Sequence, residues 1–223
     1  MSDEQGRAAR ASYNKMSGIY GLLSDDSEKQ FVEAAIRQEL KPKPGEIILE
    51  PGFGTGQVLV ALAEMVGDAG KVFGIDISDG MVEETKKRVL KKSLENRVEI
   101  VRGDAAKMPY PDRFFDAVFM SFALELFPDE EIPIILAECM RVLKTNGRIC
   151  VACMSDQGKS GAMMKMYVWA HKKFPNFVDC RPIFAKKALE SAGFDIVTQK
   201  ILSMWGLPVE IVLGRTGRAY GAD

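Results

Sequence analysis

Apolar and polar positions follow two periods along the chain. Short apolar runs predict buried strands at 47–49, 71–76, 97–101, 117–120 and 148–154. Between them, apolar residues recur every three or four positions and predict helices at 25–40, 58–66, 79–90 and 130–143. A helix at 186–192 precedes two last strands, 194–202 and 209–213, whose short link favours an antiparallel pair. The pattern predicts an α/β sheet with an antiparallel C-terminal hairpin.

The first strand runs into a glycine-rich turn, Glu50-Pro51-Gly52-Phe53-Gly54-Thr55-Gly56, that opens onto a helix. Because glycine has no Cβ atom, this spacing permits a tight turn and close approach of a ligand to the backbone. The dinucleotide fingerprint would place its third glycine where the chain has Gln57. Glu50 would also repel a pyrophosphate and attract an ammonium group. Both features disfavour an NAD-dependent reductase.

The second strand ends at Asp76, about twenty residues past the turn, where an acid can accept hydrogen bonds from ribose hydroxyls. A ribose without a pyrophosphate, together with a cationic group near Glu50, describes S-adenosyl-L-methionine (SAM). The turn resembles the first motif of class I SAM-dependent methyltransferases, and Gly74-Ile75-Asp76-Ile77-Ser78 resembles the second.

Two later segments extend the resemblance to the methyltransferases of ubiquinone and menaquinone biosynthesis. They are the run from Met108 to Asp116 before the fourth strand, and the run from Arg141 to Arg148, where Thr145-Asn146 replaces a usual Pro-Gly. The resemblance covers about residues 13–214. It implies a Rossmann-like, seven-stranded class I methyltransferase sheet with helices on both faces.

The resemblance also implies a cofactor site. In the family an acid after the third strand accepts the adenine amino group, and Asp104 takes that place, although it could instead cap a turn. The expected cofactor-binding residues are Tyr20, Glu50, Gly52, Gly54, Thr55, Gly56, Asp76, Ile77, Asp104, Ala105 and Ser121. No metal is expected.

The methyl acceptor is expected at residues 121–127, beyond the carboxyl end of the fourth strand, where open α/β sheets bind ligands. Phe122 is a candidate wall of this pocket, with core packing as its alternative. Glu125 and the single histidine, His171, are candidate general bases for a phenol, thiol or ring-carbon acceptor. Tyr167 and Arg181 are expected acceptor contacts.

The domain organisation expected is an N-terminal flap or arm at 1–24 and a methyltransferase domain at 25–223. Residues 155–183 break the strand–helix pattern, and they are rich in methionine and aromatic residues. An insertion at this place commonly forms a substrate cap in methyltransferases of this kind. A bulky apolar acceptor would suit such a deformable surface.

Composition narrows the setting of the protein. The formal net charge of -1 gives no sign of a nucleic-acid surface, and the basic run at 86–92 is expected to be a solvated helix face. No apolar run reaches the roughly 18 residues of a membrane span, and the polar start lacks a signal-peptide core. We expect a cytoplasmic protein, with peripheral membrane contact left open. Four cysteines, Cys139, Cys150, Cys153 and Cys180, are expected to be buried thiols rather than disulfides.

The function implied is methyl transfer from SAM to a small apolar acceptor, quinol or lipid-like, by direct displacement at the sulfonium methyl. Phosphatidylethanolamine, arsenite and thiol methyltransferases share the same motifs, and arsenite enzymes use a set of cysteines. A non-catalytic SAM-binding protein would keep the same cofactor residues. The sequence leaves the acceptor and the oligomeric state undetermined.

Overall fold

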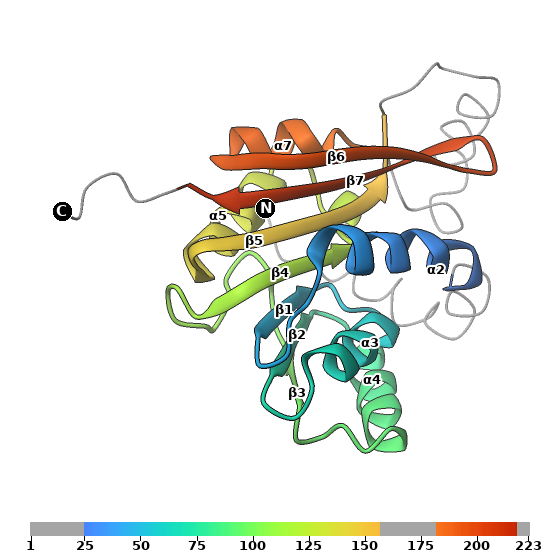
Figure 1. The fold of residues 1–223 in the computed structure, drawn as a ribbon, viewed down its shortest axis with the longest axis vertical. Helices are drawn as coiled ribbons and strands as arrows, with labels where there is room; N and C mark the ends of the chain where they lie inside the picture. Colours follow the sequence, from blue (N-terminus) through green and yellow to red (C-terminus); the bar gives the residue numbers. More distant parts are fainter. Residues whose placement is uncertain (1–24, 157–181, 218–223) are drawn as a thin grey trace, which may run out of the picture.

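A seven-stranded sheet forms the centre of the computed structural model, which describes residues 25–156 and 182–217 (Figure 1). Its strand order is β3-β2-β1-β4-β5-β7-β6. The strands are β1 (Ile47–Pro51), β2 (Lys71–Asp76), β3 (Val98–Arg102), β4 (Phe115–Ser121), β5 (Leu143–Met154), β6 (Phe194–Met204) and β7 (Leu207–Thr216). Strands β1 to β5 pair in parallel, and β7 is antiparallel to both β5 and β6. The predicted sheet and hairpin are confirmed.

Helices cover both faces of the sheet (Figure 1). One face carries α2 (Asp25–Ala34), its π-helical continuation η1 (Ala35–Leu40), α3 (Gln57–Val66) and α4 (Asp79–Lys91). The other face carries α5 (Ile132–Val142) and α7 (Ala185–Ser191). A short 3-10 helix, η2 (Leu124–Leu126), follows β4. The central strands are apolar on both sides because each side meets a helical layer.

Alternation along the strands divides the core into two main clusters. In β1, Ile48 packs toward α3 while Leu49 packs toward α5. In β4, Phe119 and Val118 divide in the same way. A third, smaller cluster lies under the β6–β7 hairpin and consists of Phe31, Phe122, Met154, Met204, Leu207 and Val209. This third cluster connects α2, the end of β4 and the hairpin.

Some local expectations were wrong. The apolar spacing that predicts the helix at 79–90 would turn Leu90 toward the core, but Leu90 is 64% exposed, because Val82, Thr85 and Val89 form the buried stripe of α4. The strand expected at 148–154 starts earlier, at Leu143, so the turn that Asn146 would make before it lies inside β5. Asn146 has a φ of 62°, and the register between β4 and β5 shifts there, so the turn survives as an irregularity of the strand.

The expected arm at 1–24 and most of the expected cap lie outside the described residues. The two ends of the 155–183 segment are described. Ser155 forms a single parallel bridge with Ile183, and the Asp156 N–H donates to the Ile183 carbonyl at 3.1 Å. The segment therefore leaves and re-enters the sheet at one place, beside the carboxyl end of β5.

Candidate functional site

The glycine turn between β1 and α3 has left-handed backbone at all three glycines. The φ angles of Gly52, Gly54 and Gly56 are 69°, 51° and 75°. A Cβ at Gly56 would lie 2.3 Å from Thr85 Cγ2, whereas a Cβ at Gly54 would meet no atom within 4 Å. Gly56 therefore allows α3 and α4 to pack closely, and Gly54 borders open space where a ligand can approach the backbone.

Helix α4 holds this turn in place through two side chains. Thr85 Oγ1 donates to the Gly54 carbonyl at 3.0 Å, and Arg88 Nε donates to the Thr55 carbonyl at 2.8 Å. Arg88 was expected on a solvated basic face, so that prediction was wrong for this residue. Thr85 and Arg88 are three positions apart and share a helix face, but only the tertiary fold brings that face against the turn.

Asp76 links the turn to the end of β2. Its Oδ2 accepts from the Gly54 N–H at 3.0 Å, and its Oδ1 accepts from the Ser78 N–H at 2.9 Å. Burial raises the pKa of Asp76, while the backbone N–H groups of Ser78, Gly54 and Ile77 oppose that rise. Each carboxylate oxygen keeps a second lone pair, so the side chain can still accept from two vicinal hydroxyls.

Glu50 ends β1 in an unusual state for a charged side chain. It is 2% exposed, and within residues 25–156 and 182–217 its Oε2 has no hydrogen-bond partner. Burial, and then the nearby Asp76 carboxylate, raises its pKa well above the ordinary glutamate value. A buried acceptor without a donor is costly, and a ligand cation would remove that cost. The site therefore fits the ammonium group of SAM.

The residues expected around adenine lie after β2 and β3. Ile77 is apolar and 36% exposed, as a surface for a flat ring would be. Asp104 is exposed, and its Oδ1 accepts from the Ala106 N–H at 2.8 Å, so the carboxylate does cap a turn. Ala105 is buried beside it. The adenine role of Asp104 stays a prediction, and Tyr20 lies outside the described residues.

The expected acceptor residues divide between the described and undescribed parts. Ser121 is half-buried at the end of β4. Phe122 is buried with a φ of 48°, a strained conformation at the ligand edge of the sheet, and its N–H donates to the Ala152 carbonyl at 2.7 Å. Glu125 is buried, and its Oε1 accepts from the Met154 N–H at 2.9 Å.

This contact gives Glu125 a structural task that the sequence did not reveal, since it joins η2 to the end of β5. Its role as a base stays a prediction. The remaining acceptor candidates, Tyr167, His171 and Arg181, lie outside the described residues.

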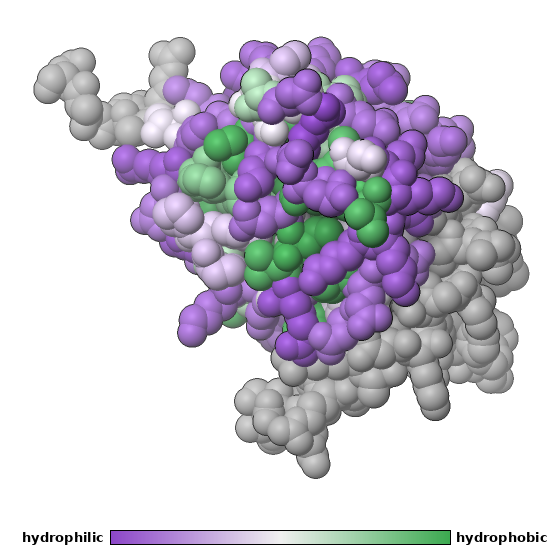
Figure 2. All heavy atoms as spheres, turned by 90° about the horizontal axis from the view of Figure 1, so that it is seen from below, coloured by the Kyte–Doolittle hydropathy of each residue, from purple (hydrophilic) through white to green (hydrophobic). Residues whose placement is uncertain are grey.

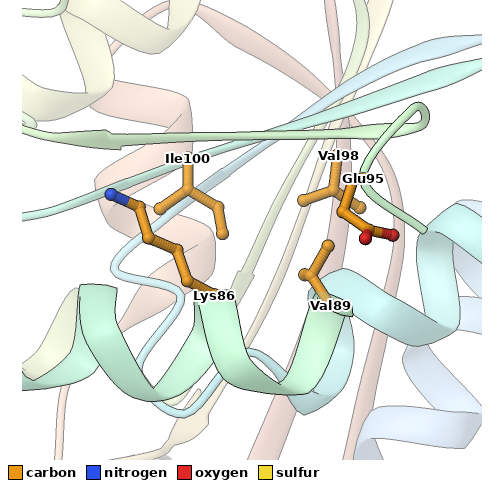
Figure 3. Close-up of a pocket in the computed structure, with 5 residues that line it drawn as sticks. All are labelled: Lys86, Val89, Glu95, Val98 and Ile100. Atoms are coloured by element: carbon orange, nitrogen blue, oxygen red, sulfur yellow. The ribbon is translucent and has the colours of Figure 1, made fainter. Parts of the chain in front are cut away.

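A surface hollow lies elsewhere, between α4 and the edge strand β3 (Figure 3). Its lining residues are Lys86, Val89, Glu95, Val98 and Ile100. Figure 2, seen from below Figure 1, shows apolar atoms gathered within a hydrophilic rim. The hollow contains none of the groups of the glycine turn, so it is not part of the candidate cofactor site.

The described cysteines support the expectation of buried thiols. Cys139, Cys150 and Cys153 are buried, and burial raises the pKa of the Cys139 thiol to about 12. Cys180 lies outside the described part of the chain. The described residues contain no cluster suited to a metal ion and no helix long and apolar enough to cross a membrane.

Comparison with protein families and with curated proteins finds methyltransferases in both cases. Residues 48–147 match a methyltransferase domain family. A demethylmenaquinone methyltransferase of Oceanobacillus iheyensis is 32% identical over 210 residues, which cover 84% of this chain and 85% of that protein. One of Lactobacillus johnsonii is 30% identical over 167 residues, 74% of this chain and 65% of the relative. The chain spans only 43% to 65% of that relative and of three others.

Solved structures agree on the fold. A SAM-dependent methyltransferase from Aquifex aeolicus matches with a TM-score of 0.64 and 23% identity, covering 93% of this chain and 98% of that one. The [4+2]-cyclase SpnF matches with a TM-score of 0.69 and 20% identity, covering 85% and 81%. With the Oceanobacillus relative matched along most of its length, the chain belongs to the ubiquinone/menaquinone biosynthesis (UbiE-like) family of class I SAM-dependent methyltransferases.

Proposed function

We propose that this protein transfers a methyl group from SAM to a small, apolar acceptor of the quinol type. The observation that carries the cofactor part is the buried Glu50 carboxylate, whose Oε2 lacks a donor from any described residue, beside Asp76 and the glycine turn. The names of the relatives support the acceptor class, because they are demethylmenaquinone methyltransferases.

The cofactor would be held by groups with complementary chemistry. Glu50 would accept from the ammonium group, Asp76 from the ribose hydroxyls, and Ile77 with Ala105 would flank the adenine ring. Gly54 would let the cofactor approach the backbone. SAM supplies the electrophilic methyl group, so the protein mainly has to align the reactants and exclude water.

The acceptor would meet the methyl group at the end of β4. Ser121 offers a hydroxyl there, and Phe122 offers an apolar wall continuous with the cluster under the hairpin. Glu125 and His171 are the proposed bases for removing a proton from a quinol or ring-carbon acceptor. Phe122 is the stronger candidate, because backbone strain like its positive φ is found mainly at functional positions.

The test is calorimetric titration with SAM and, separately, NADH, followed by a methyl-transfer assay on reduced quinones, thiols, arsenite and phospholipid amines. We expect micromolar SAM affinity, about -8 kcal/mol, and no NADH signal. Asp76→Asn should weaken SAM binding at least about tenfold, because it loses charge-assisted acceptance. Asp68→Asn is the control, since Asp68 pairs with Arg97 on the surface. Equal SAM affinity in both variants would contradict the assignment.

A second candidate is a SAM-binding protein that performs no methyl transfer. One solved structure with the same fold is named a cyclase, so the fold alone does not decide the reaction. SAM binding without formation of S-adenosylhomocysteine on any acceptor in the panel would favour this alternative. Arsenite is the weaker acceptor, because three of the four cysteines are buried.

A further inference from the structure

The tip of the β6–β7 hairpin carries an unusual residue. Trp205 and Gly206 form a two-residue turn between Met204 and Leu207, with φ angles of 53° and 84°. The Ser203 hydroxyl accepts from the Gly206 N–H at 3.2 Å and stabilises the turn. Two positive φ angles are typical of a type I′ hairpin, where asparagine or aspartate usually precedes glycine. This hairpin instead has a bulky aromatic in the left-handed conformation.

The tryptophan is also the most exposed large hydrophobic side chain among the described residues, at 72%. A bulky residue at positive φ is strained, and such strain is found mainly at functional positions. Four residues earlier, on β6, Ile201 is 45% exposed. Neither side chain belongs to a core cluster of the described residues, so both are available for contact with a partner.

The position of the tip relates it to the proposed acceptor site. The last residue of β5, Met154, pairs with Val209, and the Ser155 N–H donates to the Pro208 carbonyl at 2.9 Å. The hairpin then continues beyond the carboxyl edge of the sheet (Figure 1). Below the tip, Met204 and Leu207 pack in one cluster with Phe122. Buried apolar packing therefore joins the base of the tip to the proposed acceptor wall.

We propose that Trp205, supported by Ile201, docks the protein on a lipid bilayer at the edge where the acceptor enters. This inference rests on the proposed function, because an apolar quinol-type acceptor dissolves in lipid rather than in water. Tryptophan suits this surface, since its ring is apolar and its indole N–H prefers the headgroup level. A stable protein interface needs about 800 Å² from each partner, whereas a single protruding aromatic beside Ser203 and Gly206 suits a soft surface.

The experiment measures binding of the full chain to phosphatidylcholine vesicles by sedimentation. Trp205→Ser should lower the partition constant for vesicles about five- to tenfold, because the aromatic side chain is no longer there to be buried in the bilayer. Leu90→Ser is the matched control. Leu90 is also exposed, but it lies at the C-terminal end of α4, away from the carboxyl ends of the parallel strands. Raised salt should leave binding unchanged, since the contact is apolar. Equal losses in both variants, or equal binding of all three proteins, would overturn the proposal.

Fluorescence gives a second measurement that does not depend on affinity. The chain has two tryptophans, so Trp169→Phe leaves Trp205 as the only tryptophan whose emission is followed. Vesicles with brominated acyl chains should quench and blue-shift its emission, provided that SAM titration shows the variant is folded. Unchanged emission would overturn the proposal. So would a self-association of the wild type without vesicles that Trp205→Ser abolishes, because the tip would then bind a second copy.

The assay on two acceptors separates this inference from the proposed function. Trp205→Ser should slow methylation of a long-tailed quinol in vesicles and leave the rate on a tail-free quinol in solution unchanged. Equal slowing on both acceptors would overturn the docking role. If no quinol is methylated while the tryptophan-dependent vesicle binding remains, the acceptor assignment fails and the docking surface stands.

Discussion

At the residue scale, Glu50 should trade stability for cofactor binding. Its pKa is raised in the folded protein, mainly by burial, so the folded state keeps a proton that the unfolded state releases. The free energy of unfolding without SAM should therefore fall as the pH rises from about 4.3 toward that raised pKa. Glu50→Gln should stabilise the SAM-free protein by about 1–3 kcal/mol at pH 8, less at pH 5, and weaken SAM binding at least about tenfold.

Denaturant unfolding and calorimetry at both pH values check this prediction. The wild-type affinity for SAM should rise with pH across the same window and stay flat in the variant. Glu39→Gln is the matched control with the opposite sign. Although burial raises the pKa of Glu39, hydrogen bonds from Lys200 and Thr198 bring it below the ordinary value. That variant should lose stability at pH 8 and keep its SAM affinity, and a gain in stability would refute the electrostatic argument.

Gly54 and Gly56 make a second contrast between neighbouring residues. Gly56→Ala should destabilise the protein by about 1–3 kcal/mol, because its methyl group would collide with Thr85 while the backbone stays left-handed. Gly54→Ala meets open space, so it should cost only about 1 kcal/mol in stability but lower SAM affinity more strongly. Thermal unfolding and SAM titration of both variants check this prediction. A larger loss of SAM affinity in Gly56→Ala than in Gly54→Ala would indicate that the ligand does not approach Gly54.

At the element scale, α4 acts as the clamp of the glycine turn. Thr85→Val removes the hydroxyl that donates to the Gly54 carbonyl but preserves shape, so SAM affinity should fall several-fold with about 1 kcal/mol of stability lost. Thr216→Val is the control, because Thr216 also donates to a backbone carbonyl, that of Lys144, far from the turn. The two variants should lose similar stability in denaturant unfolding. A similar loss of SAM affinity would show that the clamp has no specific role.

The same element shows what sequence reasoning reaches and where it stops. Apolar periodicity predicted the strands and helices because a strand covered on both faces must be apolar on both faces. The turn and Asp76 were predicted because their chemistry is local in sequence. The contacts of Thr85, Arg88 and Glu125 were not, since they join residues 29 to 33 positions apart through tertiary packing. Leu90 was misplaced because helical spacing alone does not show where a sheet edge leaves a helix uncovered.

At the scale of the whole molecule, the cofactor and acceptor groups lie on different parts of one sheet. Strands β1 and β2 and helices α3 and α4 carry the glycine turn and its acids. The hairpin, α7 and the end of β5 adjoin the acceptor side, and Glu210 joins them. Its Oε1 accepts from Gln199 Nε2 at 2.7 Å, and its Oε2 accepts from the Ala185 N–H at 3.0 Å and the Ser155 hydroxyl at 3.3 Å.

This division predicts a split phenotype for Glu210→Gln. The side chain is fully buried, and both of its oxygens accept hydrogen bonds. Glutamine would put an NH2 group, itself a donor, opposite one of these donors, so stability should fall by about 1–3 kcal/mol. The KM for the acceptor should rise while the calorimetric affinity for SAM stays within about twofold, because β1, β2 and the turn keep their contacts. Thr216→Val, with an expected loss of about 1 kcal/mol, is again the destabilised control, because it leaves this junction intact. If Glu210→Gln weakens SAM and acceptor equally, the two halves of the sheet form one coupled site.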